Sequence, residues 1–329
     1  MSINSNIKEV CVIGGAGFIG SHIVRRLLED GAERVVVYDN LSGGRRSHLD
    51  PFRSEARIHV IIDDVENSEQ LFKAIQGCKH VIHLASNPDI SKAMSDPTVD
   101  FHQGTALTNA VLEASRRAGV ECVLYASGSG VYGETEDCFI PEDYSPLQPI
   151  STYGASKLAG ESLLSAYSSM FGIRGLAFRF GNVVGPHQTH GVGHDFVLRL
   201  LADPSQLEIL GDGSQSKPYI HVDDVIDALW IAESKVSQLF AVFNVAPEDY
   251  LTVNEIATMA AALVVNKNGS NVAFKYTGGD RGWKGDVPIV RLDCSRLRSF
   301  GWRPSRSSLQ AMTEALSALL ADASEGLLG

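Results

Sequence analysis

Tyr153 and Lys157 are the residues of this chain whose types and spacing could move a proton. They lie four positions apart near the start of a helix predicted over 152–171, so both side chains share one face of that helix. A tyrosine acts as a base only when its phenolate is stabilised, because the phenol has a reference pKa of about 10. A cation such as Lys157 lowers that pKa. Pairs with this spacing are common on helix surfaces, however, so the chemistry depends on what surrounds them.

Three glycines near the N-terminus predict a dinucleotide-binding turn. Gly14, Gly17 and Gly20 follow an apolar run and open a helical pattern, which places them between a strand and a helix. Gly14 permits a tight turn, Gly17 lets the backbone approach phosphates, and Gly20 lets the helix pack close to the strand. The first N–H groups of the helix then face the pyrophosphate.

Asp39 indicates which dinucleotide is bound. It ends the next predicted strand, 19 residues after Gly20, where a carboxylate can accept a hydrogen bond from the adenosine ribose. The same carboxylate repels a 2′-phosphate, so the sequence favours NAD over NADP.

Alternating strand and helix patterns must position these groups. The predicted strands are 10–13, 34–39, 58–63, 80–84, 121–126 and 174–180, and the predicted helices are 21–30, 68–76, 104–118 and 152–171. This alternation predicts an α/β fold, a Rossmann-type doubly wound parallel sheet with its ligand at the C-terminal ends of the strands.

The regular alternation of strand and helix patterns ends near Pro186, which predicts a smaller C-terminal substrate-binding lobe after it. Glycine and proline mark a loop-rich region there, and helical patterns return at 253–265 and 309–320. We expect an NAD-binding domain over 1–181 with about 219–246. The substrate-binding lobe would comprise 182–218 and 247–329.

Composition excludes several classes of partner. The 329 residues carry a formal net charge of −11, which repels nucleic acid and anionic membranes. The five cysteines lack metal or redox spacing and are expected to be reduced. The N-terminus shows no targeting segment, and no apolar run approaches the roughly 20 residues of a membrane span, so a cytoplasmic location is expected.

Further motifs extend these observations over nearly the whole chain. They are Asp39-Asn40-Leu41-Ser42, Asp64-Val65, His83-Leu84-Ala85, Val131-Tyr132-Gly133, Arg179-Phe180-Gly181-Asn182-Val183-Val184-Gly185-Pro186, Gly211-Asp212-Gly213-Ser214-Gln215 and Tyr219-Ile220-His221-Val222-Asp223-Asp224. With the glycine turn and the Tyr153/Lys157 pair, they make the chain resemble the extended short-chain dehydrogenase/reductase family. Within it, the chain is most similar to the NAD-dependent sugar-nucleotide epimerases and dehydratases like UDP-glucose 4-epimerase.

The resemblance implies a set of binding residues. Those implied for NAD are Gly14, Gly17, Phe18, Ile19, Gly20, Asp39, Asn40, Ser42, Gly43, Asp64, Val65, Leu84, Ala85, Ser86, Gln103, Ala126, Tyr153, Lys157 and Phe180. Those implied for a nucleotide-sugar substrate, expected to be UDP-linked, are Asn182, Asp195, Phe196, Lys217, Tyr219, Arg281 and Asp286, with Lys217 and Arg281 as phosphate contacts and Asp286 on the ribose. The family also implies a homodimer formed through the helices 104–118 and 152–171.

One departure from the family concerns the catalytic end of the site. Relatives carry Ser or Thr where this chain has Gly128, to hydrogen-bond the reacting hydroxyl. Ser127 and Ser129 flank that position, and we expect Ser129 to take the role in preference to Ser127. Gln103 replaces the cofactor-side Asn of the family and retains its amide chemistry.

The resemblance implies a reaction in which NAD is reduced and regenerated within one turnover. Dehydratases of the family carry acidic residues where this chain has Ser129 and Gly130, and decarboxylases usually carry Glu at the position of Gly130, so 4-epimerisation of a UDP-hexose, a uronate or an N-acetyl relative is favoured. A 4,6-dehydratase, a UDP-glucuronate decarboxylase and a noncatalytic NAD-binding protein remain as alternatives. His187, His190 and His194 lie in a glycine-rich loop without a cysteine partner, so no metal site is predicted.

Overall fold

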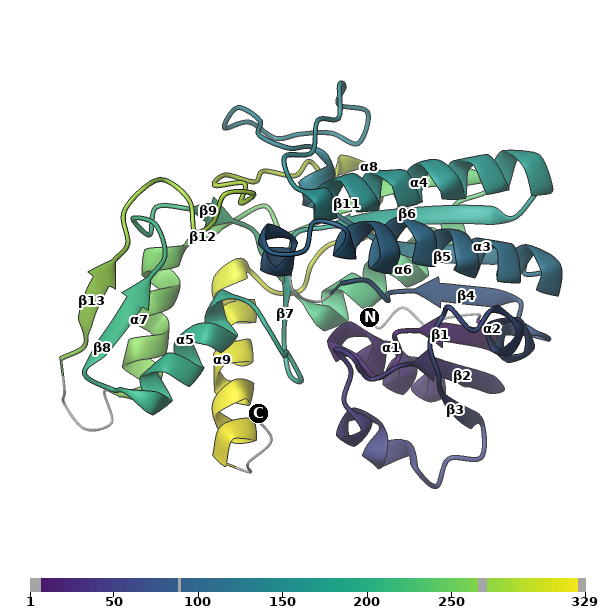
Figure 1. The fold of residues 1–329 in the computed structure, drawn as a ribbon, viewed down its shortest axis with the longest axis horizontal. Coiled ribbons are helices and arrows are strands. Elements are labelled where there is room, and N and C mark those ends of the chain that lie inside the picture. The colour runs from purple at the N-terminus through teal and green to yellow at the C-terminus, as the bar shows by residue number, and fades with distance from the viewer. Residues whose placement is uncertain (1–6, 88–89, 266–270, 325–329) are drawn as a thin grey trace.

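A parallel sheet forms the larger part of the molecule (Figure 1). The computed structural model describes residues 7–87, 90–265 and 271–324. Within them, seven strands pair in the order β11-β6-β5-β4-β1-β2-β3, and every neighbouring pair is parallel. The strands are β1 (Glu9–Ile13), β2 (Arg34–Asp39), β3 (Ile58–Ile62), β4 (His80–His83), β5 (Cys122–Gly128), β6 (Arg174–Phe180) and β11 (Phe240–Val245). The chain reverses its direction of winding between β1 and β4, where a doubly wound fold opens its ligand crevice.

Helices cover both faces of this sheet. The helices α2 (Ser68–Ile75), α3 (Leu107–Ala118) and α4 (Thr152–Phe171) bury apolar side chains in one core, and α1 (Phe18–Glu29) with α6 (Val222–Lys235) bury theirs in the other. The predicted Rossmann-type α/β fold is therefore confirmed. Two helix starts differ from the prediction: α1 begins at Phe18, directly after the glycine turn, and α3 is preceded by a π-helical turn, η3 (Phe101–Ala106).

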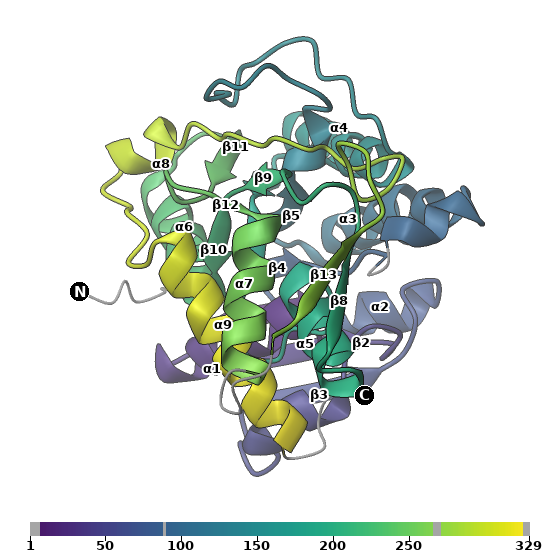
Figure 2. The same cartoon turned by 90° about the vertical axis from the view of Figure 1, so that its left-hand side faces the viewer.

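A second, smaller core lies beyond the C-terminal edge of the sheet (Figures 1 and 2). Phe196, Leu207, Ile256 and Met312 are buried together in it. Its elements are α5 (Val192–Ala202), β8 (Gln206–Ile209), α7 (Val253–Val264), β13 (Ala273–Tyr276) and α9 (Ser308–Ser324), and β8 pairs in parallel with β13. The predicted lobe of 182–218 and 247–329 contains these elements.

The segment around 292–302 packs differently from that prediction. Leu292, Leu297 and Trp302 are buried in the core of the large sheet, beside β11, and α8 (Ser295–Ser299) lies against the same strand. The chain therefore returns to the large sheet before α9 re-enters the lobe. We place the boundary of the lobe accordingly, with 292–302 on the side of the sheet.

Shorter elements connect the two cores. The strand β7 (Asn182–Val184) pairs with β10 (Tyr219–His221), and β9 (Ser216–Lys217) pairs with β12 (Leu251–Thr252). The 3₁₀ turns are η1 (Arg46–Phe52), η2 (Ile90–Met94) and η4 (Ser129–Val131).

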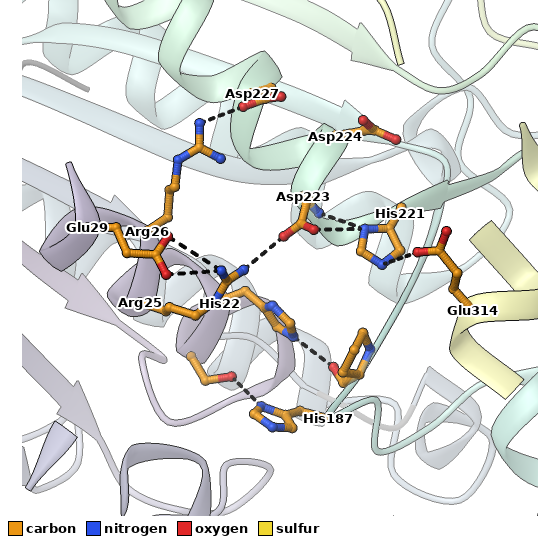
Figure 3. Close-up of polar contacts among 12 residues, drawn as sticks. His22, Arg25, Arg26, Glu29, His187, His221, Asp223, Asp224, Asp227 and Glu314 are labelled. Atoms are coloured by element: carbon orange, nitrogen blue, oxygen red, sulfur yellow. Dashed lines mark hydrogen bonds and ion pairs between the residues drawn. The ribbon is translucent and has the colours of Figure 1, made fainter. Parts of the chain in front are cut away.

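A network of charged side chains crosses the seam between the sheet and the lobe (Figure 3). Arg25 on α1 pairs with Asp223 on α6, with 3.0 Å between Nη2 and Oδ1. His221, the N-cap of α6, lies 3.4 Å from Asp223 and 3.6 Å from Glu314 on α9. These contacts join the helix after the glycine turn to a helix of the lobe.

Histidines tie the glycine turn to the loop after β7 (Figure 3). His22 Nε2 donates to the Pro186 carbonyl at 2.9 Å, and His187 Nδ1 lies 3.2 Å from the Ser21 hydroxyl. Burial lowers the pKa of His22 to about 4, so this side chain is neutral at pH 7 and its bond is between uncharged groups. The loop is therefore held against α1 over the neutral pH range.

Within the described parts of the chain, no helix is long and apolar enough to cross a membrane.

Candidate active site

A cavity of about 770 Å³ lies between the C-terminal ends of the sheet strands and the lobe. The glycine turn, Asp39, Ser86, Tyr153 and Lys157 all line it. Every residue predicted for catalysis or NAD binding lines this cavity, and so do the predicted substrate residues except Arg281. One space thus joins side chains that lie far apart in the sequence.

The glycine turn has no room for side chains. Gly14 has φ +84°, and an added Cβ would lie 2.9 Å from the Ala85 nitrogen. A Cβ on Gly20 would lie 2.2 Å from the Gly14 carbonyl oxygen. Both glycines are therefore required, one by its left-handed backbone and the other by the close packing of α1 on the turn. The cradle fits a dinucleotide, because the first turn of α1 opens on the cavity with its N–H groups.

Asp39 is held rigidly at the edge of the cavity. Its side chain is 7% exposed. Oδ2 accepts from the Ala16 N–H at 2.9 Å, and Oδ1 accepts from the Leu41 N–H at 2.8 Å. Burial raises the pKa of Asp39, while the two backbone bonds oppose that shift. The fixed carboxylate fits the NAD preference expected from the sequence.

Asp39→Asn is expected to weaken NAD binding about 10- to 100-fold. An amide cannot accept at both positions, so one of the two buried N–H groups loses its partner, which costs roughly 1–3 kcal/mol. Discrimination against NADP should fall at the same time, because the negative charge is gone. Titration calorimetry with both cofactors measures this. Asp50→Asn, on the exposed turn η1, is the control, and unchanged NAD affinity in Asp39→Asn would contradict the role of Asp39.

Tyr153 and Lys157 project from the first two turns of α4 into the cavity. Ser151 caps this helix by accepting from the Gly154 N–H at 3.0 Å. Lys157 is 3% exposed, donates to the Ala126 carbonyl at 2.8 Å and lies 5.3 Å from the centre of the Tyr153 ring. Helical spacing thus places the ammonium beside the phenol, and the N-terminal end of the helix dipole favours negative charge at Tyr153.

Burial opposes charge on both members of the pair. It raises the pKa of Tyr153 to about 12, and Asp100 adds to that shift, whereas a hydrogen bond from Ser86 lowers the pKa. Burial lowers the pKa of Lys157 to about 8, and Asp100 opposes that shift. Burial therefore separates the two pKa values, and both shifts oppose the state in which the phenol is ionised and the lysine is charged.

The Ser127 hydroxyl has a partner other than Tyr153 and Lys157. Its hydroxyl donates to Glu161 Oε1 at 2.6 Å, and Glu161 forms a buried ion pair with Arg179, 2.7 Å between Oε2 and Nη2. Sequence reasoning missed Glu161. Its position offered a signal, because it lies four residues after Lys157 on the same helix face, where a charged side chain must have a partner.

Ser129 and Gly128 lie at the end of β5, on the wall of the cavity. An added Cβ on Gly128 meets no atom within 4 Å, and its backbone is extended, so packing does not require a glycine there. Ser129 begins η4 and lines the cavity. With Ser127 bound to Glu161, Ser129 is the better placed of the two predicted serines.

The basic residues that line the lobe side of the cavity differ in part from the predicted phosphate contacts. Lys217 and Asp286 form an ion pair with each other. Arg281 is not among the residues that line the cavity, and it pairs with Glu134 at 2.6 Å and Asp280 at 3.0 Å. Arg199 on α5 lines the cavity instead, and it was missed because one arginine on an amphipathic helix gives no pattern of its own. The phosphate contact of Arg281 stays a prediction. Asn182, Asp195, Phe196 and Tyr219 line the cavity, with Asn182 hydrogen-bonded to Tyr219.

The histidine loop shows other contacts. His187 stacks on His48 with 4.6 Å between ring centres, and His194 lies 3.5 Å from Asp195. Within the described ranges, no group of three or more His, Cys, Asp or Glu side chains is arranged to hold a metal ion.

Known proteins share both the sequence and the fold. Residues 10–246 match the NAD dependent epimerase/dehydratase family. The chain is 32% identical over 300 residues to the UDP-glucose 4-epimerase of Mycolicibacterium smegmatis, covering 89% of this chain and 92% of the relative.

Two solved structures have the same architecture. The UDP-glucose 4-epimerase of Thermotoga maritima, crystallised with UDP-glucose, aligns with a TM-score of 0.84 and 29% identity over 95% of this chain and 99% of that one. A double mutant of the dTDP-glucose 4,6-dehydratase of Streptomyces venezuelae, crystallised with NAD, aligns with a TM-score of 0.86 and 26% identity over 97% and 99%. The cofactor of this chain is NAD, and the chain belongs to the NAD dependent epimerase/dehydratase family.

Proposed function

We propose that this enzyme is a nucleotide-sugar 4-epimerase that acts on a UDP-hexose through transient oxidation at C4. The observation that carries the proposal is the Tyr153/Lys157 pair in a cavity whose described lining residues place no carboxylate on the wall of 128–130. Among the described residues that line the cavity, the acids lie elsewhere: Asp39, Asp63, Asp64 and Glu66 near the second and third strands, and Asp195 and Asp286 on the lobe side.

The pair supplies the proton transfer that inversion at C4 needs. Tyr153, as phenolate beside the Lys157 ammonium, accepts the proton of the C4 hydroxyl, so the O4–H bond breaks and a phenol O–H bond forms. NAD, when bound, supplies the hydride chemistry by taking the C4 hydrogen and returning it. Tyr153 then returns its proton to O4 once the sugar presents its other face. No net oxidation results.

The missing acid favours epimerisation over dehydration or decarboxylation. Elimination of a C6 hydroxyl requires a group that protonates it, and the wall of 128–130 offers glycines and Ser129. Asp100 is the nearby carboxylate, but it is buried behind the wall, and both of its oxygens accept hydrogen bonds. A site built in this way can oxidise C4 and return the hydride without losing a group from the sugar.

The lobe supports a substrate that carries a diphosphate. Lys217 and Arg199 bring positive charge to the lobe side of the cavity, although the net charge of the chain is −11. The ion pair between Lys217 and Asp286 would open on binding, freeing the ammonium for a phosphate and the carboxylate for a ribose hydroxyl. A nucleotide anchored at this end leaves the sugar free to turn at the Tyr153 end.

A panel of nucleotide sugars tests the proposal. The purified protein is incubated with UDP-glucose, UDP-glucuronate and their N-acetylated relatives, and products are followed by proton NMR and mass spectrometry. We expect inversion at C4 of at least one substrate at unchanged mass. Loss of water would identify a dehydratase and loss of carbon dioxide a decarboxylase, and absence of turnover with all of them would exclude the assignment.

We also infer that two copies associate in the cytoplasm through the faces of α3 and α4. These helices pack against each other, and large apolar side chains are exposed at the start of η3, which precedes α3, and at the end of α4, namely Phe101, Met170 and Phe171. Such exposure favours burial against a second copy. Light scattering that gives the mass of one chain would contradict this inference.

A further inference from the structure

A buried ion pair joins the helix of the catalytic pair to the sheet. Glu161 on α4 and Arg179 on β6 are 4% and 3% exposed. Arg179 Nε donates to Glu161 Oε1 at 2.9 Å, and its Nη2 donates to Oε2 at 2.7 Å. Two parallel bonds of this kind fix the relative direction of the two groups as well as their distance.

The ion pair also holds both ends of residues 127–132, which we call the wall segment. At its start, the Ser127 hydroxyl donates to Glu161 Oε1 at 2.6 Å. At its end, Arg179 Nη1 donates to the Tyr132 hydroxyl at 2.8 Å. The carboxylate thus binds one end of the wall segment and the guanidinium binds the other.

The middle of the wall segment is in backbone contact with α4. A Cβ added to Gly154 would lie 2.5 Å from the Gly130 carbonyl oxygen. Tyr153 directly precedes Gly154 on the helix, Ser129 directly precedes Gly130 on the wall segment, and both side chains line the cavity. A shift of the wall segment along α4 would therefore change the placement of the two hydroxyls relative to each other.

We propose that Glu161 and Arg179 are positioning residues, whose ion pair fixes the wall segment against α4. Its effect on the reaction is to keep the Ser129 and Tyr153 hydroxyls in one arrangement. The inference rests on the proposed function for the step that these hydroxyls serve. Neither charged residue is among those that line the cavity, so both act through residues that are.

Stability alone does not account for a buried ion pair at this place. Moving two charges out of water costs free energy, and apolar side chains of similar volume often give equal or greater stability. What an arginine–carboxylate pair adds is a single geometry, because the guanidinium presents its donors in a rigid fork. We therefore expect the pair to serve the position of the wall segment more than the stability of the fold.

Hydrogen exchange of the NAD-bound protein, followed by mass spectrometry, tests the positioning without any sugar. In Glu161→Met/Arg179→Met, the amides of 128–133 should exchange about tenfold faster, whereas those of β1 should exchange as in the wild type. The thermal midpoint should stay near that of the wild type. The matched control is Arg174→Met/Glu233→Met, which removes an ion pair at the opposite end of β6 and should leave exchange of 128–133 unchanged.

Turnover of a substrate from the panel separates geometry from charge. Arg179→Lys keeps the positive charge but cannot form the two parallel bonds, so kcat should fall about tenfold with KM unchanged. The same variant should also show the faster exchange. Ser127→Ala should lower kcat in the wild type and add nothing in Glu161→Met/Arg179→Met, because its hydroxyl acts through Glu161.

The outcomes distinguish this role from the assignment of the reaction. Unchanged exchange of 128–133 in both Arg179→Lys and the double methionine variant would overturn the role even if a sugar of the panel reacts. Faster exchange throughout the sheet with unchanged kcat would also overturn it, since a pair that only stabilises the fold gives that pattern. Faster exchange confined to 128–133 would support the role even if no sugar reacts. Arg179→Lys retains both charges, so the test does not depend on the folding of the double variant.

Discussion

Tyr153→Phe is expected to lower kcat by about 10²–10⁴-fold with little change in the affinity for NAD or substrate. The variant keeps the ring that packs beside Lys157 and loses the one oxygen that can accept the O4 proton. Burial raises the pKa of this phenol to about 12, so the wild-type enzyme needs the cation, the helix dipole and the bound cofactor to populate the phenolate. Turnover of the sugar identified in the panel, measured across pH, gives the ratio.

Separate readouts distinguish a chemical effect from a folding effect in this variant. Calorimetric binding of NAD and the thermal midpoint should remain near wild type, because the phenol oxygen is the only group removed. Tyr276→Phe, an exposed phenol on β13, is the matched control and should keep full turnover. A Tyr153→Phe enzyme with turnover within tenfold of wild type would require another base in the cavity.

Local patterns explain why most of the fold and the cofactor half of the site could be predicted. The glycine turn, the strand that ends at Asp39 and the spacing of Tyr153 with Lys157 are each contained in a short stretch of chain. Their geometry follows from helix and strand periods, which a sequence displays directly. The structure brings these stretches to one cavity because parallel strands end at the same edge of a sheet.

Contacts between distant segments explain what the sequence left open. Ser127 and Ser129 look equivalent in sequence, and the structure separates them because Glu161, 34 residues after Ser127, accepts the first hydroxyl. Arg281 is predicted as a phosphate contact, and the structure adds an ion pair with Glu134, which lies 147 positions away. Such partners depend on tertiary packing and carry no local pattern.

Lys157→Met is expected to lose activity and gain stability. Methionine fills nearly the same volume without charge, so the Tyr153 phenolate loses its cation and turnover at pH 7 should fall about 10²-fold or more, with the rising limb of the pH profile displaced to higher pH. Burial lowers the pKa of Lys157 from 10.5 to about 8. At pH 7 the ammonium is charged in both the folded and the unfolded chain, so the folded state bears the full cost of burying it.

That cost has a defined pH dependence. Between about pH 8 and 10.5 the unfolded chain binds more protons at this site than the folded chain, so the stability of the wild type rises with pH in this window. The methionine variant lacks this rise. The substitution also leaves the Ala126 carbonyl without its donor, which offsets part of the gain. We expect roughly 1–3 kcal/mol of added stability at pH 7, shrinking towards zero near pH 10.

Urea unfolding without added cofactor at pH 7, 9 and 10 measures the effect, with turnover measured in parallel. Lys235→Met, an exposed lysine at the end of α6, is the control and should change neither quantity. A Lys157→Met protein that is both less active and less stable at pH 7 would indicate that the lysine serves mainly as a hydrogen-bonded anchor for β5. If Lys157→Met instead lowers turnover and raises the free energy of unfolding, the buried Lys157 ammonium destabilises the fold. The enzyme would then retain this charge because the Tyr153 phenolate requires it.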